Sequence, residues 1–247
     1  MSGFHDDVAV VTGGTRGIGR AVAERLADGG ATVVATYHDD EEAAERTRER
    51  LGAYRAETRV ERCDVTDFDA VGATFETVAD RHGPPTVLVN NAGTMDNGLL
   101  VRMTPDQWDR VIETNLTGAF HCTREAARSM LRHDGGRIVN VASVAAQRGW
   151  AGQVNYAASK AGLIGLTRAA ARELGTKGIR INAVAPGYTD TGLVENVADY
   201  ESDVANRTAS GRLATPAEVA DVVAFLASDD ASYVHGEVLR VDDGLLG

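Results

Sequence analysis

Short apolar runs alternate with longer amphipathic stretches along most of the chain. The apolar runs predict buried strands at residues 7–12, 31–36, 58–63, 86–90, 137–142 and 238–241, with a sixth strand in chain order ending before residue 189. Helical spacing predicts helices at residues 20–27, 40–51, 67–82, 104 to about 132, 154 onward and 216–227. This alternation is typical of α/β proteins. We predict a single doubly wound (Rossmann-type) domain over residues 1–247, a seven-stranded parallel sheet with helices on both faces.

One segment, residues 189–212, interrupts this alternation. It contains Gly192 and Gly211 and an irregular polar spacing without a clear period. Long connections of this kind in compact domains often serve as lids over active sites. Because the segment follows the sixth strand, whose carboxyl end should border the cleft, we expect a lid that sets substrate choice.

The first strand runs into a glycine-rich turn that is followed at once by an amphipathic helix. The turn reads Gly13-Gly14-Thr15-Arg16-Gly17-Ile18-Gly19. Glycines allow the backbone to turn tightly and to approach a pyrophosphate, whose charge the helix N-terminus stabilises. The spacing Gly-x-x-x-Gly-x-Gly differs from the common Gly-x-Gly-x-x-Gly fingerprint, and a glycine cluster can also be purely structural. The position between a strand and a helix favours phosphate binding.

The end of the second strand indicates which dinucleotide binds. An acidic residue there would bind the ribose 2′-hydroxyl of NAD, but this chain has Tyr37, followed by His38. Arg16, inside the glycine turn, could contact a 2′-phosphate, although an exposed arginine on a surface turn is the alternative. We therefore predict NADP(H) rather than NAD(H) as the cofactor.

Composition narrows the functional classes. The 247-residue chain has a formal net charge of −11, which argues against general binding to nucleic acid or membrane surfaces. No apolar run approaches the roughly 20 residues needed to span a bilayer, and the N-terminus does not resemble a signal peptide. The two cysteines fit reduced core thiols, so we expect a cytoplasmic protein, and we expect no metal site. Only two of the 25 basic residues are lysines, which fits either codon bias or adaptation to high salt.

The candidate chemistry lies between residues 143 and 160. Tyr156 and Lys160 are four residues apart in a helical pattern, so a helix would place them one turn apart on one face. A free tyrosine has a pKa near ~10, which a nearby ammonium group lowers. Ser143 follows a predicted strand, where its hydroxyl could face the phenol across a crevice. On spacing alone, a half-buried aromatic beside a solvated amine is the more common arrangement.

Further polar residues occur at strand ends and inside a helix. Asp64 ends the third strand and could accept a hydrogen bond from adenine, whereas Thr66 or Asp67 could cap the next helix. The fourth strand leads into Asn90-Asn91-Ala92-Gly93. We favour structural hydrogen bonds for the side-chain amides of Asn90 and Asn91, whereas Gly93 would let a ligand approach the backbone. Asn115 lies within a predicted helix, which is locally unfavourable. It could kink the helix around a water or simply be exposed.

Taken in order, these motifs resemble the short-chain dehydrogenase/reductase family over essentially the whole chain. They are Thr12-Gly13-x-x-x-Gly17-x-Gly19, Asn90-Asn91-Ala92-Gly93, Asn115, Ser143, Tyr156-x-x-x-Lys160 and Pro186-Gly187. Each motif alone is weak, but the ordered set is specific. Residues 155–166, 180–187 and 223–229 are similar to the corresponding stretches of bacterial 3-oxoacyl-(acyl-carrier-protein) reductases and acetoacetyl-CoA reductases.

The resemblance implies a role for individual residues. Tyr156 would donate a proton to the substrate carbonyl, Lys160 would lower the phenol pKa and bind the nicotinamide ribose, and Ser143 would hydrogen-bond the developing alkoxide. Asn115 would hold a water that links Lys160 to solvent. The residues expected to contact the cofactor are Gly13, Thr15, Arg16, Gly17, Ile18, Gly19, Tyr37, Asp64, Val65, Asn91, Ala92, Gly93, Tyr156, Lys160, Pro186, Gly187 and Thr189.

The resemblance also implies the strand order 3-2-1-4-5-6-7, a homotetramer, and NADPH-dependent reduction of a 3-oxoacyl thioester of acyl-carrier protein or CoA. The alternatives are a dehydrogenase of another secondary alcohol, such as a sugar, steroid or polyol, and a non-catalytic dinucleotide-sensing subunit. The chain departs from the family by ending Val241-Asp242-Asp243-Gly244, where Val-Asp-Gly-Gly is common. Basic residues that could receive an acidic carrier protein beside the site entrance are Arg128, Arg132, Arg137 and Lys177.

Overall fold

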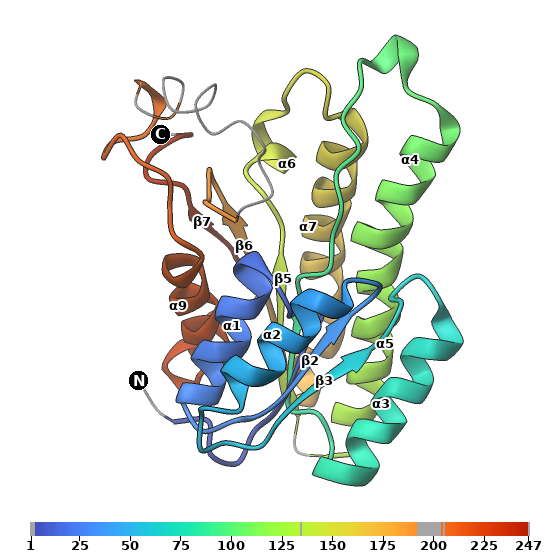
Figure 1. The fold of residues 1–247 in the computed structure, drawn as a ribbon, viewed down its shortest axis with the longest axis vertical. Coiled ribbons are helices and arrows are strands. Elements are labelled where there is room, and N and C mark those ends of the chain that lie inside the picture. The colour runs from blue at the N-terminus through green and yellow to red at the C-terminus, as the bar shows by residue number, and fades with distance from the viewer. Residues whose placement is uncertain (1–2, 134, 192–203, 205, 247) are drawn as a thin grey trace.

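Seven parallel strands form one sheet in the computed structural model, which describes residues 3–133, 135–191, 204 and 206–246 (Figure 1). The strands are β1 (Val8–Val11), β2 (Thr32–Tyr37), β3 (Thr58–Arg62), β4 (Val87–Asn90), β5 (Gly136–Val141), β6 (Ile179–Pro186) and β7 (Val238–Val241). Their order, β3-β2-β1-β4-β5-β6-β7, confirms the predicted fold and topology. The order reverses between β1 and β4, and such a switch point leaves a crevice for ligands at the carboxyl ends of the strands.

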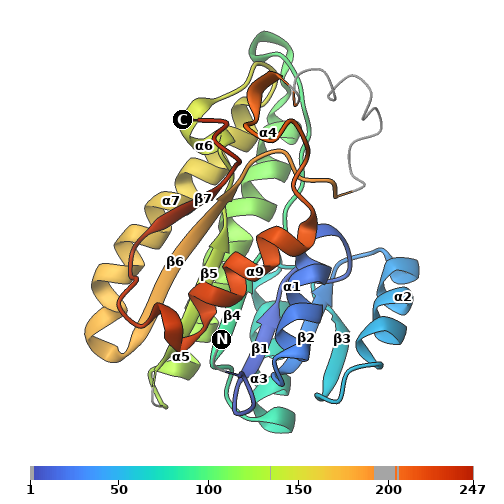
Figure 2. The same cartoon turned by 90° about the vertical axis from the view of Figure 1, so that its left-hand side faces the viewer.

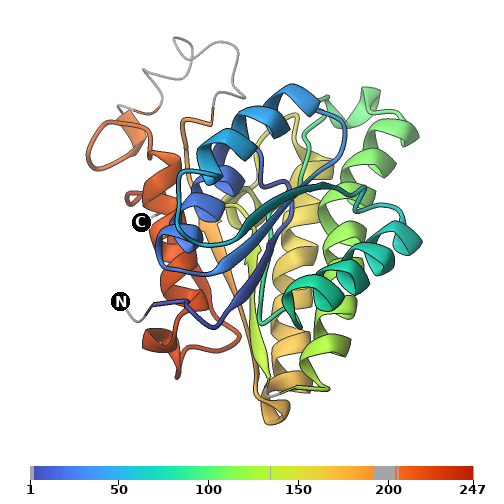
Figure 3. The same cartoon turned by 60° about the horizontal axis from the view of Figure 1, so that its bottom comes forward.

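Helices cover both faces of the sheet (Figures 2 and 3). They are α1 (Gly17–Asp28), α2 (Glu41–Leu51), α3 (Phe68–His82), α4 (Pro105–Ile112), α5 (Gly118–Met130), α6 (Ala145–Arg148), α7 (Val154–Leu174) and α9 (Pro216–Ala227). On one face α1 packs against α2 and α9, and on the other α3 packs against α5 while α7 packs on β6. Within the described ranges, no helix combines the length and the apolar character that crossing a membrane requires.

Strand side chains alternate between two apolar clusters, one under each helical layer. In β1, Val11 joins the cluster that contains Leu26 of α1, whereas Val10 joins the cluster that contains Phe75 of α3 and Met130 of α5. Both faces of the strand are therefore dry, which explains why its sequence is uniformly apolar. The two clusters fix the strands in one register, so that their carboxyl ends meet at a common edge.

The predicted helix from residue 104 to about 132 is interrupted in the structure. It begins as predicted, with Thr104 as its N-cap, but α4 ends at Ile112. A π-helical turn, η2 (Glu113–Thr117), then separates α4 from α5. Asn115 lies in this turn and is only 1% exposed, so the alternative of an exposed asparagine is wrong. Single π turns inside helices are frequent at functional sites.

Two predicted helix starts can be checked at the level of single hydrogen bonds. Thr215 caps α9, because its side chain accepts a hydrogen bond from the Glu218 backbone amide. Asp67 caps α3 by accepting from two backbone amides, whereas the Thr66 hydroxyl donates to Asp64 instead. Of the two caps considered for this helix, Asp67 is therefore the one that is used.

An ion-pair network closes the amino ends of the central strands. Arg137, at the start of β5, donates hydrogen bonds to Asp7 at 2.5 Å and to Asp229 at 2.7 Å. Lys177 lies at the same end of the sheet, in the 3₁₀ turn η3 (Gly175–Lys177) before β6. Both residues therefore lie opposite the carboxyl-end crevice of their own chain. The suggestion that they flank its entrance is wrong within one chain.

The two ends of the predicted lid lie side by side. Thr189 and Ala214 form an isolated parallel bridge. The Asp190 amide donates to the Ala214 carbonyl, and the Ala214 amide donates to the Tyr188 carbonyl, both at 2.9 Å. Residues 192–203 and 205 lie outside the described residues, so a lid over 189–212 stays a prediction.

Candidate active site

Ser143, Tyr156 and Lys160 lie together where β5 ends and α7 begins. Tyr156 and Lys160 lie one turn apart near the start of α7, and Lys160 Nζ is 5.7 Å from the centre of the Tyr156 ring. Ser143 follows β5, and its Oγ accepts a hydrogen bond from the Ala145 amide at 3.1 Å. The Ser143 hydroxyl is close enough to the Tyr156 hydroxyl to lower the pKa of Tyr156. The structure thus brings together the three side chains that the sequence singles out.

Lys160 is buried. The residue is 3% exposed, and its Nζ donates a hydrogen bond to the Val141 carbonyl at 2.8 Å. Burial lowers the pKa of Lys160 to about 8, because an ammonium group is poorly solvated there. At neutral pH the amine is still mostly protonated, but it is close to the range in which it releases its proton.

The predicted lowering of the Tyr156 pKa by Lys160 is wrong for the chain by itself. Burial raises the pKa of Tyr156, and the nearby Ser143 hydroxyl opposes only part of that rise. The Lys160 ammonium points its proton at the Val141 carbonyl rather than at the phenol oxygen. Loss of solvation of the phenolate therefore outweighs the attraction of the nearby cation.

Asn115 ties the π turn to the loop after β4 and to α7. Its Oδ1 accepts from the Thr94 amide at 2.7 Å, and its Nδ2 donates to the Thr94 carbonyl at 3.0 Å and to Ser159 Oγ at 3.1 Å. A Cβ at Gly93 would lie 3.2 Å from Asn115 Oδ1 and 3.5 Å from Lys160 Nζ. Asn115 and Gly93 thus both lie near Lys160, as expected if all three residues belong to one site. The water that Asn115 is predicted to hold stays a prediction.

The glycine turn has the backbone that the sequence predicts. Gly13 and Gly17 have φ values of 60° and 51°, in the left-handed region that favours glycine. Asn91 closes the turn from β4, because its Nδ2 donates to the Thr12 carbonyl at 3.0 Å and to the Gly13 carbonyl at 2.9 Å. The structural role favoured for Asn91 is therefore present. The turn ends at the N-terminus of α1, where a pyrophosphate is stabilised.

Gly19 is the position in this turn that can least accept a side chain. A Cβ there would lie 2.2 Å from the Gly13 carbonyl oxygen and 2.3 Å from Asn91 Nδ2. We expect Gly19→Ala to displace the turn and to raise the Kd for NADPH by roughly 100-fold, or to prevent folding, as overpacking against rigid backbone does. Fluorescence titration with NADPH and thermal denaturation measure the two effects.

Gly72 provides the matched control for that substitution. It lies in α3, where an added Cβ would meet nothing within 4 Å. Gly72→Ala should leave NADPH binding unchanged and stabilise the protein by about 0.5–1 kcal/mol, because alanine is the better helix former. Wild-type NADPH affinity in Gly19→Ala would show that the close approach at Gly19 is not needed for binding.

The end of β2 carries a carboxylate that the sequence analysis did not place there. The buried Tyr37 donates its hydroxyl proton to Glu41 at 2.5 Å, and Arg48 donates to the same carboxylate at 2.9 Å. Glu41 follows Tyr37 by four residues across a turn into α2, and this spacing was the available signal. Arg16 occupies the N-cap position of α1 without a hydrogen bond from its side chain to the helix, and that side chain is 57% exposed and lies 3.5 Å from Asp40. The Arg48 guanidinium neutralises the charge of the Glu41 carboxylate, while the Arg16 guanidinium stays accessible to a ligand.

Asp64 lies at the carboxyl end of β3, as an adenine contact requires. Its Oδ1 accepts from the Thr66 amide at 2.9 Å and from the Thr66 hydroxyl at 2.7 Å. Burial acts against the charged form, but the hydrogen bonds from Thr66 and the charge of His38 together lower the pKa of Asp64. Val65 beside it is buried against Gly118 of α5. The carboxylate is therefore ionised and held in place at the edge of the crevice.

Three other residues that were predicted to contact the cofactor make contacts within the protein, at the carboxyl end of the sheet. The Thr15 carbonyl accepts from the Thr47 hydroxyl at 2.9 Å, and the Ala92 amide donates to the Thr12 hydroxyl at 3.0 Å. Ile18 packs against the apolar cluster under α1. Their positions agree with a role in holding the glycine turn in shape. Direct contact of these residues with a dinucleotide stays a prediction.

The segment that leaves β6 reaches back to the glycine turn. Gly187 follows Pro186 at the end of β6, and its amide donates to the Val241 carbonyl at 2.9 Å. The Thr189 hydroxyl donates to the Gly187 carbonyl at 3.3 Å. A Cβ at Gly17 would lie 3.2 Å from Thr191, so the predicted contacts after β6 and those in the turn border one space.

An aromatic pair that was not predicted from the sequence lies at the segment after β6. The Trp150 and Tyr188 ring centres are 6.2 Å apart, and the Arg148 guanidinium lies 5.7 Å from the Trp150 ring. Trp150 lies in the loop between α6 and α7, and Tyr188 lies just after β6, so the pair joins these two segments. A large aromatic in a stretch of small residues was the signal that could have found it.

Comparison with known proteins agrees with this geometry. A family model described as Enoyl-(Acyl carrier protein) reductase matches residues 13–246. The 3-oxoacyl-(acyl-carrier-protein) reductase FabG of Vibrio harveyi is 42% identical over 96% of both chains. The reductase MabA of Mycobacterium tuberculosis, with the same descriptive name, is 45% identical over 96% of this chain and 91% of its own. A solved structure assigned as a short-chain alcohol dehydrogenase from Sinorhizobium meliloti 1021 aligns with a TM-score of 0.92, at 35% identity over 98% of both chains.

The doubly wound sheet and the residues gathered at its carboxyl edge define an oxidoreductase that uses a nicotinamide dinucleotide. The chain belongs to the short-chain dehydrogenase/reductase family, since the matches cover nearly its whole length. The resemblance drawn from the ordered motifs is thereby confirmed.

Proposed function

We propose that the protein reduces a 3-oxoacyl thioester to the 3-hydroxyacyl thioester with NADPH as the reductant. The observation that carries the proposal is the cluster of Ser143, Tyr156 and Lys160 at the carboxyl end of β5. It occurs in a chain that is 41–45% identical to curated reductases of 3-oxoacyl-acyl-carrier protein. The free, buried Cys63 and Cys122 support a reducing, cytoplasmic setting.

Each of the three side chains has a distinct task in this reaction. The dinucleotide, when bound, supplies the hydride that adds to the ketone carbon. The Tyr156 hydroxyl donates its proton to the ketone oxygen, and its raised pKa keeps it protonated at neutral pH until charge develops on that oxygen. Ser143 donates a hydrogen bond to the same oxygen. Lys160, with a pKa of about 8, can return a proton to the Tyr156 oxygen.

Purified protein with NADPH and acetoacetyl-CoA tests this proposal. We expect loss of NADPH absorbance with one 3-hydroxybutyryl-CoA formed per NADPH consumed. A panel of CoA and acyl-carrier-protein thioesters at low and high salt identifies the preferred carrier, because docking of an acidic protein is screened by salt. Turnover of a sugar or steroid alcohol without turnover of any thioester would replace the proposal by a dehydrogenase of another secondary alcohol.

The preference for NADPH rests on Arg16. Its guanidinium lies in the glycine turn and is exposed, and the end of β2 carries Tyr37 where NAD-selective proteins carry an acid. We expect Arg16→Ala to raise the KM for NADPH about tenfold and to change the KM for NADH less than about twofold, because a charge-assisted hydrogen bond to phosphate is lost. Asp40→Asn, which removes a competing carboxylate, should lower the KM for NADPH. A lower KM for NADH than for NADPH in the wild type would refute the preference.

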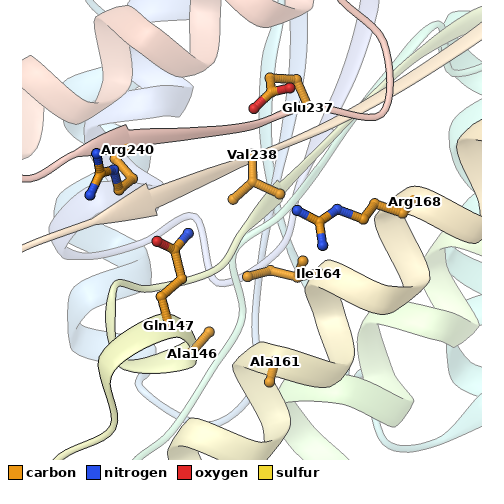
Figure 4. Close-up of a pocket in the computed structure, with 8 residues that line it drawn as sticks. All are labelled: Ala146, Gln147, Ala161, Ile164, Arg168, Glu237, Val238 and Arg240. Carbon is orange, nitrogen blue, oxygen red and sulfur yellow. The ribbon is translucent and has the colours of Figure 1, made fainter. Parts of the chain in front are cut away.

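We also propose that the protein forms a homotetramer, because it presents two separate faces that a second copy could cover. On α4 and α5, Trp108 and Phe120 are large apolar side chains that are exposed. The second face is a cavity of about 530 Å³ beside the edge strand β7 (Figure 4). Two independent self-complementary faces are what a tetramer with twofold axes needs.

Charge reversal in the cavity tests the second face. Arg168 of α7 and Glu237 beside β7 line this cavity with opposite charges (Figure 4). Across a twofold axis each could pair with the other on the second copy. Light scattering should show smaller assemblies for Arg168→Glu and for Glu237→Arg, and recovery in the double variant. Phe120→Glu should disrupt the α4–α5 face independently, and a monomeric wild type would refute the tetramer.

A further inference from the structure

Asp243 stands where the family pattern commonly has glycine. Its φ is 50°, and within the described ranges it alone has a left-handed backbone without being glycine. Aspartate tolerates this region better than most residues do, but less well than glycine. A glycine would make the same turn without strain, so the carboxylate should contribute something that a glycine cannot.

The carboxylate holds Ser210. Asp243 Oδ2 accepts hydrogen bonds from the Ser210 amide at 2.7 Å and from the Ser210 hydroxyl at 2.6 Å. The Asp243 carbonyl also accepts from the Ala209 amide at 2.9 Å. The bonds from Ser210 lower the pKa of Asp243, which is therefore ionised at neutral pH and a stronger acceptor. The nearby charges of Arg212 and Glu218 pair with each other at 2.7 Å.

Ser210 belongs to a return segment, residues 208–214, that leads towards α9. This segment ends against the exit segment, residues 187–191, which leaves β6. The Ala214 amide donates to the Tyr188 carbonyl, and the Asp190 amide donates to the Ala214 carbonyl. Backbone pairing therefore transmits the position of the return segment to the exit segment.

The exit segment contacts both the loop before α7 and the glycine turn. Tyr188 contacts Trp150 in the loop between α6 and α7, with ring centres 6.2 Å apart. Thr191 approaches the glycine turn, at 3.2 Å from the position of a Cβ on Gly17. A shift of this segment would thus change the space in which the dinucleotide lies.

We propose that Asp243 is a positioning residue for the dinucleotide, because its hold on Ser210 fixes the return segment and, through it, the exit segment beside the glycine turn. The inference rests on the dinucleotide part of the proposed function and does not depend on the thioester substrate.

Two substitutions at Asp243 separate the hydrogen bonds from the backbone strain. Asp243→Gly removes the carboxylate and relieves the strain, whereas Asp243→Ala removes the carboxylate and keeps the strain. Both variants should raise the Kd for NADPH, measured by fluorescence titration of the substrate-free protein, by about fivefold, because two hydrogen bonds to the carboxylate are lost and part of their effect reaches the dinucleotide site. The thermal midpoint should be higher for the glycine variant than for the alanine variant. A merely structural role would instead make Kd follow the thermal midpoint.

Ser210→Ala and Asp230→Ala complete the series. Ser210→Ala keeps the amide donor and loses the hydroxyl donor. The Kd for NADPH should therefore rise about twofold, which is less than the rise expected for the Asp243 variants. Asp230→Ala removes an exposed carboxylate beyond the other end of α9 and should leave Kd unchanged. Unchanged NADPH affinity in Asp243→Gly would overturn the proposal. Failure of the wild type to reduce thioesters would refute the proposed substrate and leave this series of Kd values intact.

Discussion

Replacing Tyr156 by phenylalanine should lower kcat for thioester reduction by roughly 1,000-fold, within the range expected for loss of a general acid. The substitution removes only the hydroxyl group, which is the proposed source of the proton for the ketone oxygen. The ring remains at the start of α7, where its centre lies 5.7 Å from Lys160 Nζ. Because the ring and its packing are retained, the substitution should have little effect on the free energy of unfolding. Steady-state NADPH oxidation at saturating substrate measures the loss.

Two controls separate chemistry from structure in this experiment. The Kd of Tyr156→Phe for NADPH should stay within about threefold of the wild type, because aromatic contacts persist. Ser143→Ala, which removes one donor to the same oxygen, should lower kcat by about 100-fold. If Tyr156→Phe retained more than about a tenth of the wild-type kcat, another group would be the acid. Survival of every cellular phenotype in this variant would instead favour a dinucleotide-sensing subunit.

The fold is largely predictable from the sequence because each strand is buried on both faces. Val10 and Val11 enter opposite apolar clusters, so β1 needs apolar residues throughout and appears as an uninterrupted run. Helix starts are equally local: Thr104 and Thr215 each cap a helix through the next turn of the chain. The starts and ends of these elements are therefore predicted to within about three residues, the largest difference being at α1, which begins at Gly17 rather than at residue 20.

Several properties of the site depend on residues that are distant in sequence. These properties could not be predicted from the sequence. The pKa of Tyr156 rises because α7 packs it into the protein, which no spacing between Tyr156 and Lys160 reveals. The π turn at Asn115 arises where its side chain bonds the loop after β4 and α7. The bonds between Asp243 and Ser210 join residues 33 positions apart. The burial of a polar side chain and the contacts between residues distant in sequence have no local sequence signature.

Lys160→Met should abolish activity and make the protein more stable at neutral pH. The pKa of Lys160 falls to about 8 on burial from an unfolded value near ~10.4, a difference of about 2.4 units or about 3 kcal/mol against the charged folded form. Methionine fills a similar volume without that charge, but it leaves the Val141 carbonyl without its donor. A net gain of about 2 kcal/mol would raise the thermal midpoint by about 5 °C for a protein of this size.

The dependence on pH identifies the cause of this gain. Between pH 8 and about 10.4 the unfolded wild type binds more protons at Lys160 than the folded form does, so its stability from this group rises with pH. The advantage of Lys160→Met should therefore be largest and constant below pH 8 and should shrink as pH rises through this window. Denaturant unfolding from pH 6 to pH 10 measures the difference in free energy of unfolding. A difference that does not change with pH would mean that packing, rather than a buried ammonium group, separates the two proteins.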